Sequence, residues 1–212
     1  KNQMSLKIVF MGTPEFSIPS LKILKQSDHK IVCVYTQPPK KKSRGQKILK
    51  TAVHVFSENE GIKVNTNNLD NEEEYKNFIR LNPDLVVVVA YGQIIPDIYL
   101  KNPDLIFLNL HASLLPKWRG AAPIERSILN KDKETGISIM KIEKKLDTGP
   151  FIKQVKVKIN EETTSGELSK KLSVLGAEAL KDSIELISSS KASFKKQNEK
   201  NATYAKKINK IE

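Results

Sequence analysis

The sequence predicts an α/β fold built on a doubly wound, mostly parallel sheet, with a C-terminal strand pair and a long helix after it. Short apolar segments alternate with amphipathic ones, which is the β-α-β order of such sheets. Residues 83–92 read PDLVVVVAYG, and an apolar run without alternation is typical of a strand buried on both faces. The 212 residues suffice for one domain with a sizeable core, expected over residues 4–190, followed by a basic linker over residues 191–212.

The first half of the chain contains strand and helix patterns in turn. Apolar runs bounded by polar or turn residues predict four strands, at residues 6–12, 30–36, 62–65 and 83–92. Segments with helical spacing of apolar residues lie between them, at residues 13–27, 49–61 and 71–81. Residues 37–50 are expected to form a basic loop.

The second half begins with a strand at residues 104–112 and a helix at residues 122–130. Residues 135–159 read as two strands joined by a turn. Residues 163–190 have the pattern of a long amphipathic helix, in which Gly176 is the expected point of any break because glycine lowers helix propensity.

Composition and charge narrow the functional classes. The net charge is +12, and residues 37–50 hold six basic residues and no acidic one, which points to an anionic partner. No apolar run approaches the ~20 residues of a membrane span, and the N-terminus lacks a signal-peptide core. Cys33 is the single cysteine, so no internal disulfide can form. We therefore expect a cytoplasmic protein, and a monomer.

Three short motifs carry little chemistry when taken alone. MGTPEF at residues 11–16 follows a strand as a phosphate loop would, but it lacks the glycine pattern and the lysine of such loops. LDTGP at residues 146–150 is similar to the Asp-Thr-Gly of aspartic proteases, which need two such aspartates, and by itself it suits a hairpin turn. The three histidines show no ligand spacing, so no metal is expected.

Asn109 and His111 stand two residues apart at the end of a predicted strand. Side chains alternate along a strand, so both project from one face while Leu108 and Leu110 project from the other. Ligands of open α/β sheets bind at the carboxyl ends of the strands, where this pair lies. Taken alone, the pair also fits a strand end hydrogen-bonded to a neighbouring loop.

Taken together, NLHASLLPKWRGAAPI at residues 109–124 and the later LDTG resemble the folate-dependent formyltransferases, whose catalytic domain is Rossmann-like. The resemblance covers essentially the whole chain and is supported by KIVFMGTPEFS, VYTQP with the later RG, VVVAYGQIIP, ETGISIM and TYAKKI. Within the family, the run Arg119 to Pro123 favours the members that formylate methionyl initiator tRNA over those that formylate glycinamide ribonucleotide. Two alternatives remain: another amine acceptor, such as that ribonucleotide or an amino-sugar nucleotide, and an RNA-binding module without catalysis.

The resemblance implies attack of an amine on the formyl carbon of 10-formyltetrahydrofolate, without a covalent enzyme intermediate or a metal. Asn109 would donate its amide N–H to the developing oxyanion. His111 would donate a second bond and, when protonated, balance the charge. Asp147 would pair with His111 and accept the proton of the amine. We expect its carboxylate within ~4 Å of the imidazole or one water away.

The resemblance also assigns two binding regions. The folate pocket would use Ser113, Leu114, Leu115 and Pro116 as a rigid wall, with a cis bond expected before Pro116, and backbone near Val89, Tyr91 and Gly92. The tRNA phosphates would meet basic residues of the 37–50 segment, namely Lys40, Lys41, Lys42, Arg44 and Lys47. Arg119 would either meet the tRNA or orient the pocket loop. Ser43 stands where the family commonly has glycine. A β-rich tRNA-binding domain would follow the linker in the full-length family members, so we expect a catalytic domain here.

Overall fold

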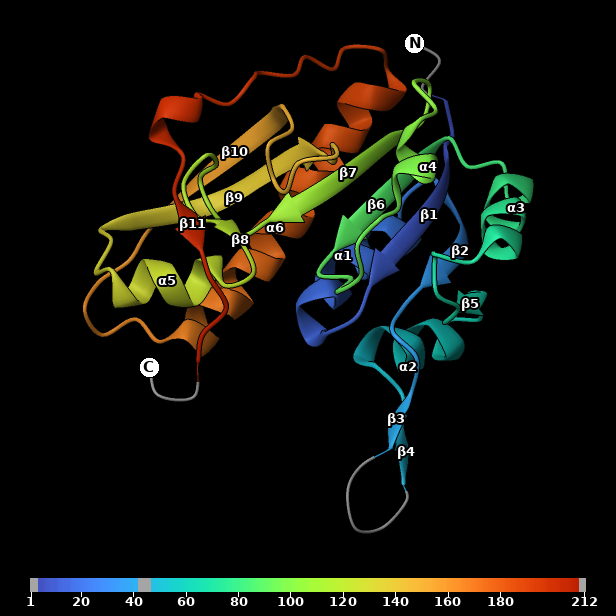
Figure 1. The fold of residues 1–212 in the computed structure, drawn as a ribbon, viewed down its shortest axis with the longest axis horizontal. Coiled ribbons are helices and arrows are strands. Elements are labelled where there is room, and N and C mark those ends of the chain that lie inside the picture. The colour runs from blue at the N-terminus through green and yellow to red at the C-terminus, as the bar shows by residue number, and fades with distance from the viewer. Residues whose placement is uncertain (1–3, 42–46, 210–212) are drawn as a thin grey trace. The chain divides into compact units, whose positions relative to one another are not determined.

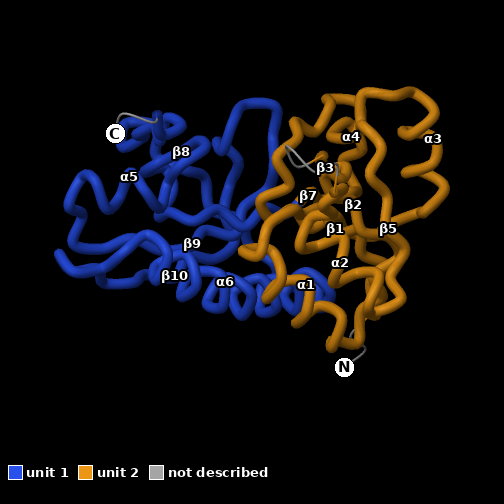
Figure 2. The backbone as a smooth tube through the Cα atoms, turned by 90° about the horizontal axis from the view of Figure 1, so that it is seen from below, with its two compact units in different colours: residues 1–3, 108–212 blue, residues 4–107 orange. Residues whose placement is uncertain are grey.

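The computed structural model describes residues 4–41 and 47–209. The chain divides into two compact units, an N-terminal unit of residues 4–107 and a C-terminal unit from residue 108 onward (Figure 2). Among the described residues, no helix has the length and apolar content that a membrane crossing requires.

The N-terminal unit is built on a parallel sheet in the order β6-β1-β2-β5 (Figure 1). The strands are β1 (Lys7–Gly12), β2 (Lys30–Tyr35), β5 (Val64–Asn65) and β6 (Leu85–Val89). Every residue of β6 is buried, which explains why its sequence is apolar without alternation. All four strands lie within the ranges expected from the sequence.

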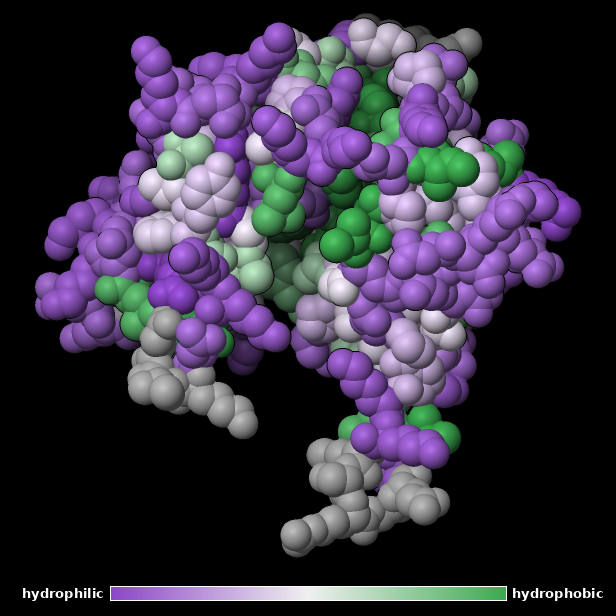
Figure 3. Space-filling model, in the orientation of Figure 1, coloured by the Kyte–Doolittle hydropathy of each residue, from purple (hydrophilic) through white to green (hydrophobic). Residues whose placement is uncertain are grey.

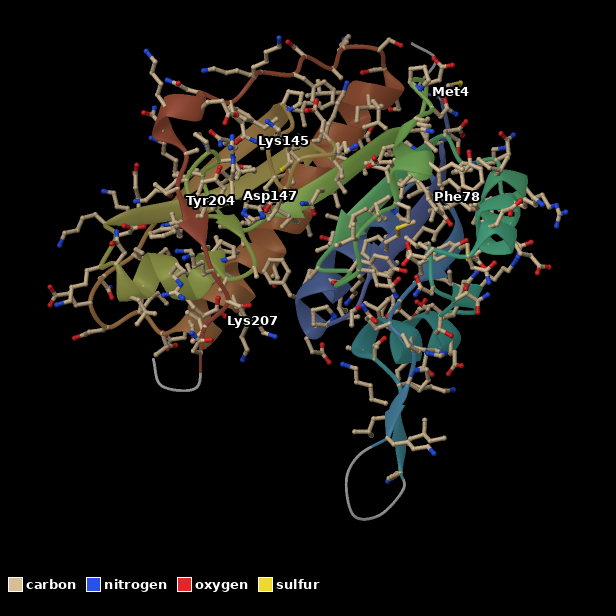
Figure 4. All side chains as sticks on the ribbon, viewed as in Figure 1. Met4, Phe78, Lys145, Asp147, Tyr204 and Lys207 are labelled. Carbon is tan, nitrogen blue, oxygen red and sulfur yellow. The ribbon has the colours of Figure 1, made fainter. Side chains whose placement is uncertain are left out.

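Helices of the N-terminal unit follow the strands as predicted. They are the 3-10 helix η1 (Glu15–Ser17), α1 (Ile18–Lys25), α2 (Ala52–Asn59), α3 (Glu72–Arg80) and the unforeseen short helix α4 (Asp97–Leu100). The Thr51 hydroxyl caps α2 by accepting the backbone N–H of His54 at 3.0 Å. Phe78 of α3, labelled in Figure 4, is fully buried with its ring centroid 5.0 Å from that of Tyr99. This aromatic contact joins α3 to α4.

The basic segment 37–50 contains a small hairpin rather than only a loop. Strands β3 (Lys40–Lys41) and β4 (Ile48–Leu49) pair antiparallel, with Lys40 opposite Leu49 and Lys41 opposite Ile48. Ile48 and Leu49 are 61% and 45% exposed, and Figure 3 shows apolar atoms there beside hydrophilic ones. The sequence did not predict the hairpin because two-residue strands are too short for a periodic pattern.

The C-terminal unit has an antiparallel sheet in the order β10-β9-β7, covered by a long helix (Figure 1). Its elements are β7 (Ile106–His111), α5 (Pro123–Leu129), β9 (Glu134–Lys141), β10 (Phe151–Lys158) and α6 (Ser165–Ser188). The predicted α/β class, with a mostly parallel sheet, a strand pair and a long helix, is confirmed.

Gly176 does not break α6, which runs unbroken through it. A Cβ at this position would stand 2.6 Å from Cδ1 of Leu110 in β7. Such a separation is shorter than real Cβ contacts, so the glycine allows the helix to approach the sheet closely. The residue is explained by packing and not by a helix end.

Residues 191–209, expected as a linker, make ordered contacts within the C-terminal unit. Phe151 and Lys195 form an isolated antiparallel bridge, and the 3-10 helix η2 (Glu199–Asn201) follows. Strand β11 (Tyr204–Ala205) then pairs in parallel with β8 (Arg119–Gly120). The tail therefore returns to the segment that follows β7.

Candidate active site

Asn109 and His111 lie on β7, where alternation gives both side chains the same face. In the antiparallel pairing with β9, Asn109 stands opposite Met140 and His111 stands opposite Ser138. Leu108 and Leu110 are buried between them, and His111 is the last residue of the strand. The predicted placement of the pair on one face at the strand's carboxyl end is confirmed.

The imidazole of His111 is oriented by one backbone carbonyl. Its Nε2 lies 2.8 Å from the carbonyl oxygen of Trp118. A carbonyl can only accept, so Nε2 carries the proton of this hydrogen bond. The other ring nitrogen, Nδ1, faces Asp147 with 3.8 Å to Oδ2. The expected proximity of these two groups is confirmed, and the geometry makes Nδ1 the nitrogen at which a proton can be gained or lost.

Asp147 sits on the loop between β9 and β10 in a left-handed conformation, with φ of 52° (Figure 4). Its Oδ2 accepts the backbone N–H of Gly120 at 2.7 Å, which aims the carboxylate at His111. Gly149, two residues on, packs so close to the carbonyl oxygen of Lys141 that a Cβ there would overlap it. The Asp-Thr-Gly sequence therefore forms a tight turn that presents the carboxylate.

The segment Ser113 to Pro116 is fixed by two polar side chains of the sheet. The fully buried Ser138 hydroxyl donates to the Ser113 carbonyl at 2.7 Å and accepts the Leu115 N–H at 3.0 Å. The Gln154 amide donates to the Leu115 carbonyl at 2.9 Å. Leu114 and Pro116 are partly exposed, and the Leu115–Pro116 peptide bond is cis, as predicted. These contacts give the segment the rigidity expected of a pocket wall.

The remaining residues assigned to the folate pocket lie in the N-terminal unit. Val89 ends β6, and the carbonyl of Tyr91 accepts the Thr13 hydroxyl at 2.7 Å. Gly92 has φ of 82°, a conformation that favours glycine. Within the described ranges, no group of three or more His, Cys, Asp or Glu side chains is placed to hold a metal ion.

The basic residues divide by exposure. Lys40, Lys41 and Lys47 are exposed on or beside the β3–β4 hairpin, whereas Lys42 and Arg44 lie outside the described residues. Arg119 is buried, with 1% of its surface exposed, and its guanidinium is bound to Gln197 and Glu199. A buried guanidinium does not reach a tRNA phosphate, so of the two roles expected for Arg119 the burial favours orienting the pocket loop.

Three residues that support the site were missed by the sequence analysis: Ser138, Gln154 and Gln197. Ser138 interrupts the apolar run ISIM with a small polar residue, and this was a usable signal. Gln154 and Gln197 lie in lysine-rich stretches that resemble ordinary surface. Their partners are 39 to 50 residues away, so no local pattern reveals them.

Comparison with known proteins agrees with this geometry. The family model described as formyl transferase matches residues 6–184. The chain is 52% identical to a methionyl-tRNA formyltransferase of Pelagibacter ubique over 99% of its length, covering 68% of that protein. It is 45% identical to the methionyl-tRNA formyltransferase of Coxiella burnetii, again over 99% of its length and 67% of that protein.

Solved structures share the fold at lower identity. A phosphoribosylglycinamide formyltransferase from Anaplasma phagocytophilum superposes with a TM-score of 0.71 at 19% identity, covering 88% of this chain and 89% of that one. An N-formyltransferase from Helicobacter canadensis, solved with folinic acid and dTDP-3-aminofucose, gives 0.70 at 22% identity, covering 95% of this chain and 71% of that one.

Proposed function

The chain belongs to the formyl transferase family, and from this membership we propose that it transfers the formyl group of 10-formyltetrahydrofolate to the α-amino group of methionyl initiator tRNA. The methionyl-tRNA formyltransferases that match nearly all of the chain at 45–52% identity support this acceptor. The observation that carries the chemistry is the meeting of His111 and Asp147 beside Asn109.

The reaction needs one new bond, one broken bond and one proton transfer. The amine nitrogen attacks the formyl carbon, and the carbonyl oxygen becomes an oxyanion in a tetrahedral intermediate. The carbon–nitrogen bond to N10 of the folate then breaks, and the proton lost by the amine balances the one gained by N10. A catalyst for this sequence must stabilise the oxyanion and move that proton.

The three polar residues divide these tasks. The Asn109 amide donates an N–H to the oxyanion, a contribution of about 3 kcal/mol in comparable sites. His111 uses its Nε2–H for the Trp118 carbonyl, so it acts through Nδ1, whose protonated form places a positive charge beside the intermediate. The Asp147 carboxylate stabilises that charge and accepts the amine's proton, directly or through a water.

For the folate, the proposed wall is Ser113 to Pro116, held by Ser138 and Gln154. A wall fixed before binding loses little conformational freedom when the ligand arrives. Backbone at Val89, Tyr91 and Gly92 completes the proposed pterin contacts.

For the tRNA, the proposed contact is the β3–β4 hairpin. Lys40, Lys41 and Lys47 are exposed there, and lysine binds phosphate as a point charge without reading sequence. The adjoining Lys42 and Arg44 are proposed to add to this contact. We further propose a monomer in the cytoplasm, whose catalytic part is residues 4–190.

A formylation assay tests the proposal. The chain is given 10-formyltetrahydrofolate and, in parallel, methionyl initiator tRNA, glycinamide ribonucleotide or an amino-sugar nucleotide. We expect transfer to the charged tRNA only, and loss of transfer by at least about a hundredfold in Asn109→Ala or His111→Ala. Preferred transfer to either small acceptor would overturn the assignment of the acceptor. Full activity in either variant would remove that residue from the mechanism.

A further inference from the structure

The Gln197 side chain spans from the tail to the loop that carries Asp147. Its Nε2 donates to two backbone carbonyls, those of Asp147 at 2.8 Å and Gly149 at 2.7 Å. Its Oε1 accepts from Nε and Nη2 of Arg119, at 3.1 and 2.9 Å. Both N–H groups and the oxygen of the amide are thereby used, so its orientation is fully determined.

Arg119 gives this contact a rigid base. The guanidinium side chain is 0% exposed, and it also pairs with the Glu199 carboxylate at 2.8 Å. The hydrogen bond with Glu199 raises the pKa of Arg119 and lowers the pKa of Glu199, so both stay charged near neutral pH. Because the arginine is buried and held by two acceptors, the Gln197 oxygen is fixed in place.

The opposite side of the Asp147 loop is held separately. The Gly120 N–H binds the Asp147 carboxylate, while Gln197 binds the Asp147 carbonyl. Asp147 has positive φ, which costs about 1–2 kcal/mol for a non-glycine residue and persists only when its surroundings enforce it. Contacts on both the side chain and the backbone supply that enforcement.

We propose that Gln197 is a positioning residue for formyl transfer, which keeps the Asp147 carboxylate aligned with His111 by binding the Asp147 and Gly149 carbonyls. The proposal rests on the proposed function, because it assigns Gln197 to the same catalytic set. Gln197 does not touch the reacting atoms. Its effect passes through the conformation of residues 147–149, where a misplacement of about 1 Å can cost a hundredfold in rate.

Gln197→Glu separates this role from general attachment of the tail. A carboxylate keeps and strengthens the pairing with Arg119, but it cannot donate to either carbonyl. Glu199→Gln is the comparison, since it weakens the hold on Arg119 without touching residues 147–149. Lys196→Ala, an exposed neighbour, is the control. For each variant, kcat, KM for both substrates, thermal stability and hydrogen–deuterium exchange of residues 147–150 are measured.

We expect Gln197→Glu to lower kcat about tenfold, with both KM values within about twofold and faster exchange at residues 147–150. Glu199→Gln should lower the melting temperature with a much smaller change in kcat, and Lys196→Ala should match the wild type. Gln197→Ala replaces Gln197→Glu if the latter does not fold. The proposal is overturned if Gln197→Glu keeps wild-type kcat and exchange, or if Glu199→Gln loses as much activity. Failure of the wild type to formylate tRNA would instead refute the proposed function, and the exchange comparison would still test the contact.

Discussion

Replacing Asp147 with asparagine removes one negative charge while keeping the size of the side chain and an acceptor for the Gly120 N–H. In the structure this charge lies 3.8 Å from Nδ1 of His111, and the two side chains are 11% and 8% exposed. Coulomb attraction at that separation is about 4 kcal/mol for an effective dielectric of about 20. Desolvation of both groups offsets part of it, so we expect a net loss of roughly 3 kcal/mol of transition-state stabilisation, or about a hundredfold in rate.

The assay is kcat for formylation of methionyl initiator tRNA at saturating folate. Glu143→Gln serves as the matched control, because it removes an exposed carboxylate from the same loop and should retain activity within about twofold. Combining Asp147→Asn with His111→Gln should cost little more than His111→Gln alone, since the carboxylate acts through the imidazole. An Asp147→Asn variant within about threefold of the wild type would refute the charge argument, as would fully additive losses in the double variant.

Three further predictions concern binding and stability. Replacing the exposed hairpin lysines with alanine should flatten the salt dependence of tRNA affinity by about 0.7–0.9 log units per lost phosphate contact and leave folate affinity unchanged, in titrations over a salt series; the variant combines Lys40, Lys41 and Lys47. Burial raises the pKa of Asp132, but hydrogen bonds from Trp118, Asn130 and Lys117 outweigh it and lower the pKa overall. Its stabilisation is therefore present above the ordinary pKa of 3.8 and lost as pH falls through the lower folded value, so in urea unfolding Asp132→Asn should cost about 1–3 kcal/mol at pH 7 and progressively less in acid; an equal cost at all pH values would contradict this. Gly149→Ala should lower the melting temperature by several degrees, because its Cβ overlaps the Lys141 carbonyl oxygen, and an unchanged melting temperature would show that the turn can relax.

The sequence analysis succeeded where structure follows from local pattern. The uninterrupted apolar run of β6 marked a buried parallel strand, and alternation along β7 placed Asn109 and His111 on one face. Asp147 could be assigned only through the resemblance, because its distance from His111 depends on how β9 and β10 turn back along β7.

The unpredicted parts depend on contacts between distant residues. Strands β8 and β11 have two residues each, and their pairing joins Gly120 to Ala205. Arg119 looked like a surface cation by composition, yet Gln197 and Glu199, 78 and 80 residues away, provide the acceptors that allow it to be buried. A helix break at Gly176 was a reasonable local expectation that the close packing of Leu110 overrides.

The return of the tail to the active-site loop gives the order of biosynthesis a consequence. The Asp147 carbonyl binds a side chain 50 residues further along the chain. At a synthesis rate of about 5–20 residues per second, roughly 3–10 s separate the appearance of Asp147 from that of its partner Gln197. During that interval β7, β9 and β10 already have their sequence partners, whereas the left-handed turn at Asp147 lacks one of its two supports. The nascent chain therefore acquires its sheet before its catalytic geometry, and competence for the reaction arrives only with the last elements to be made.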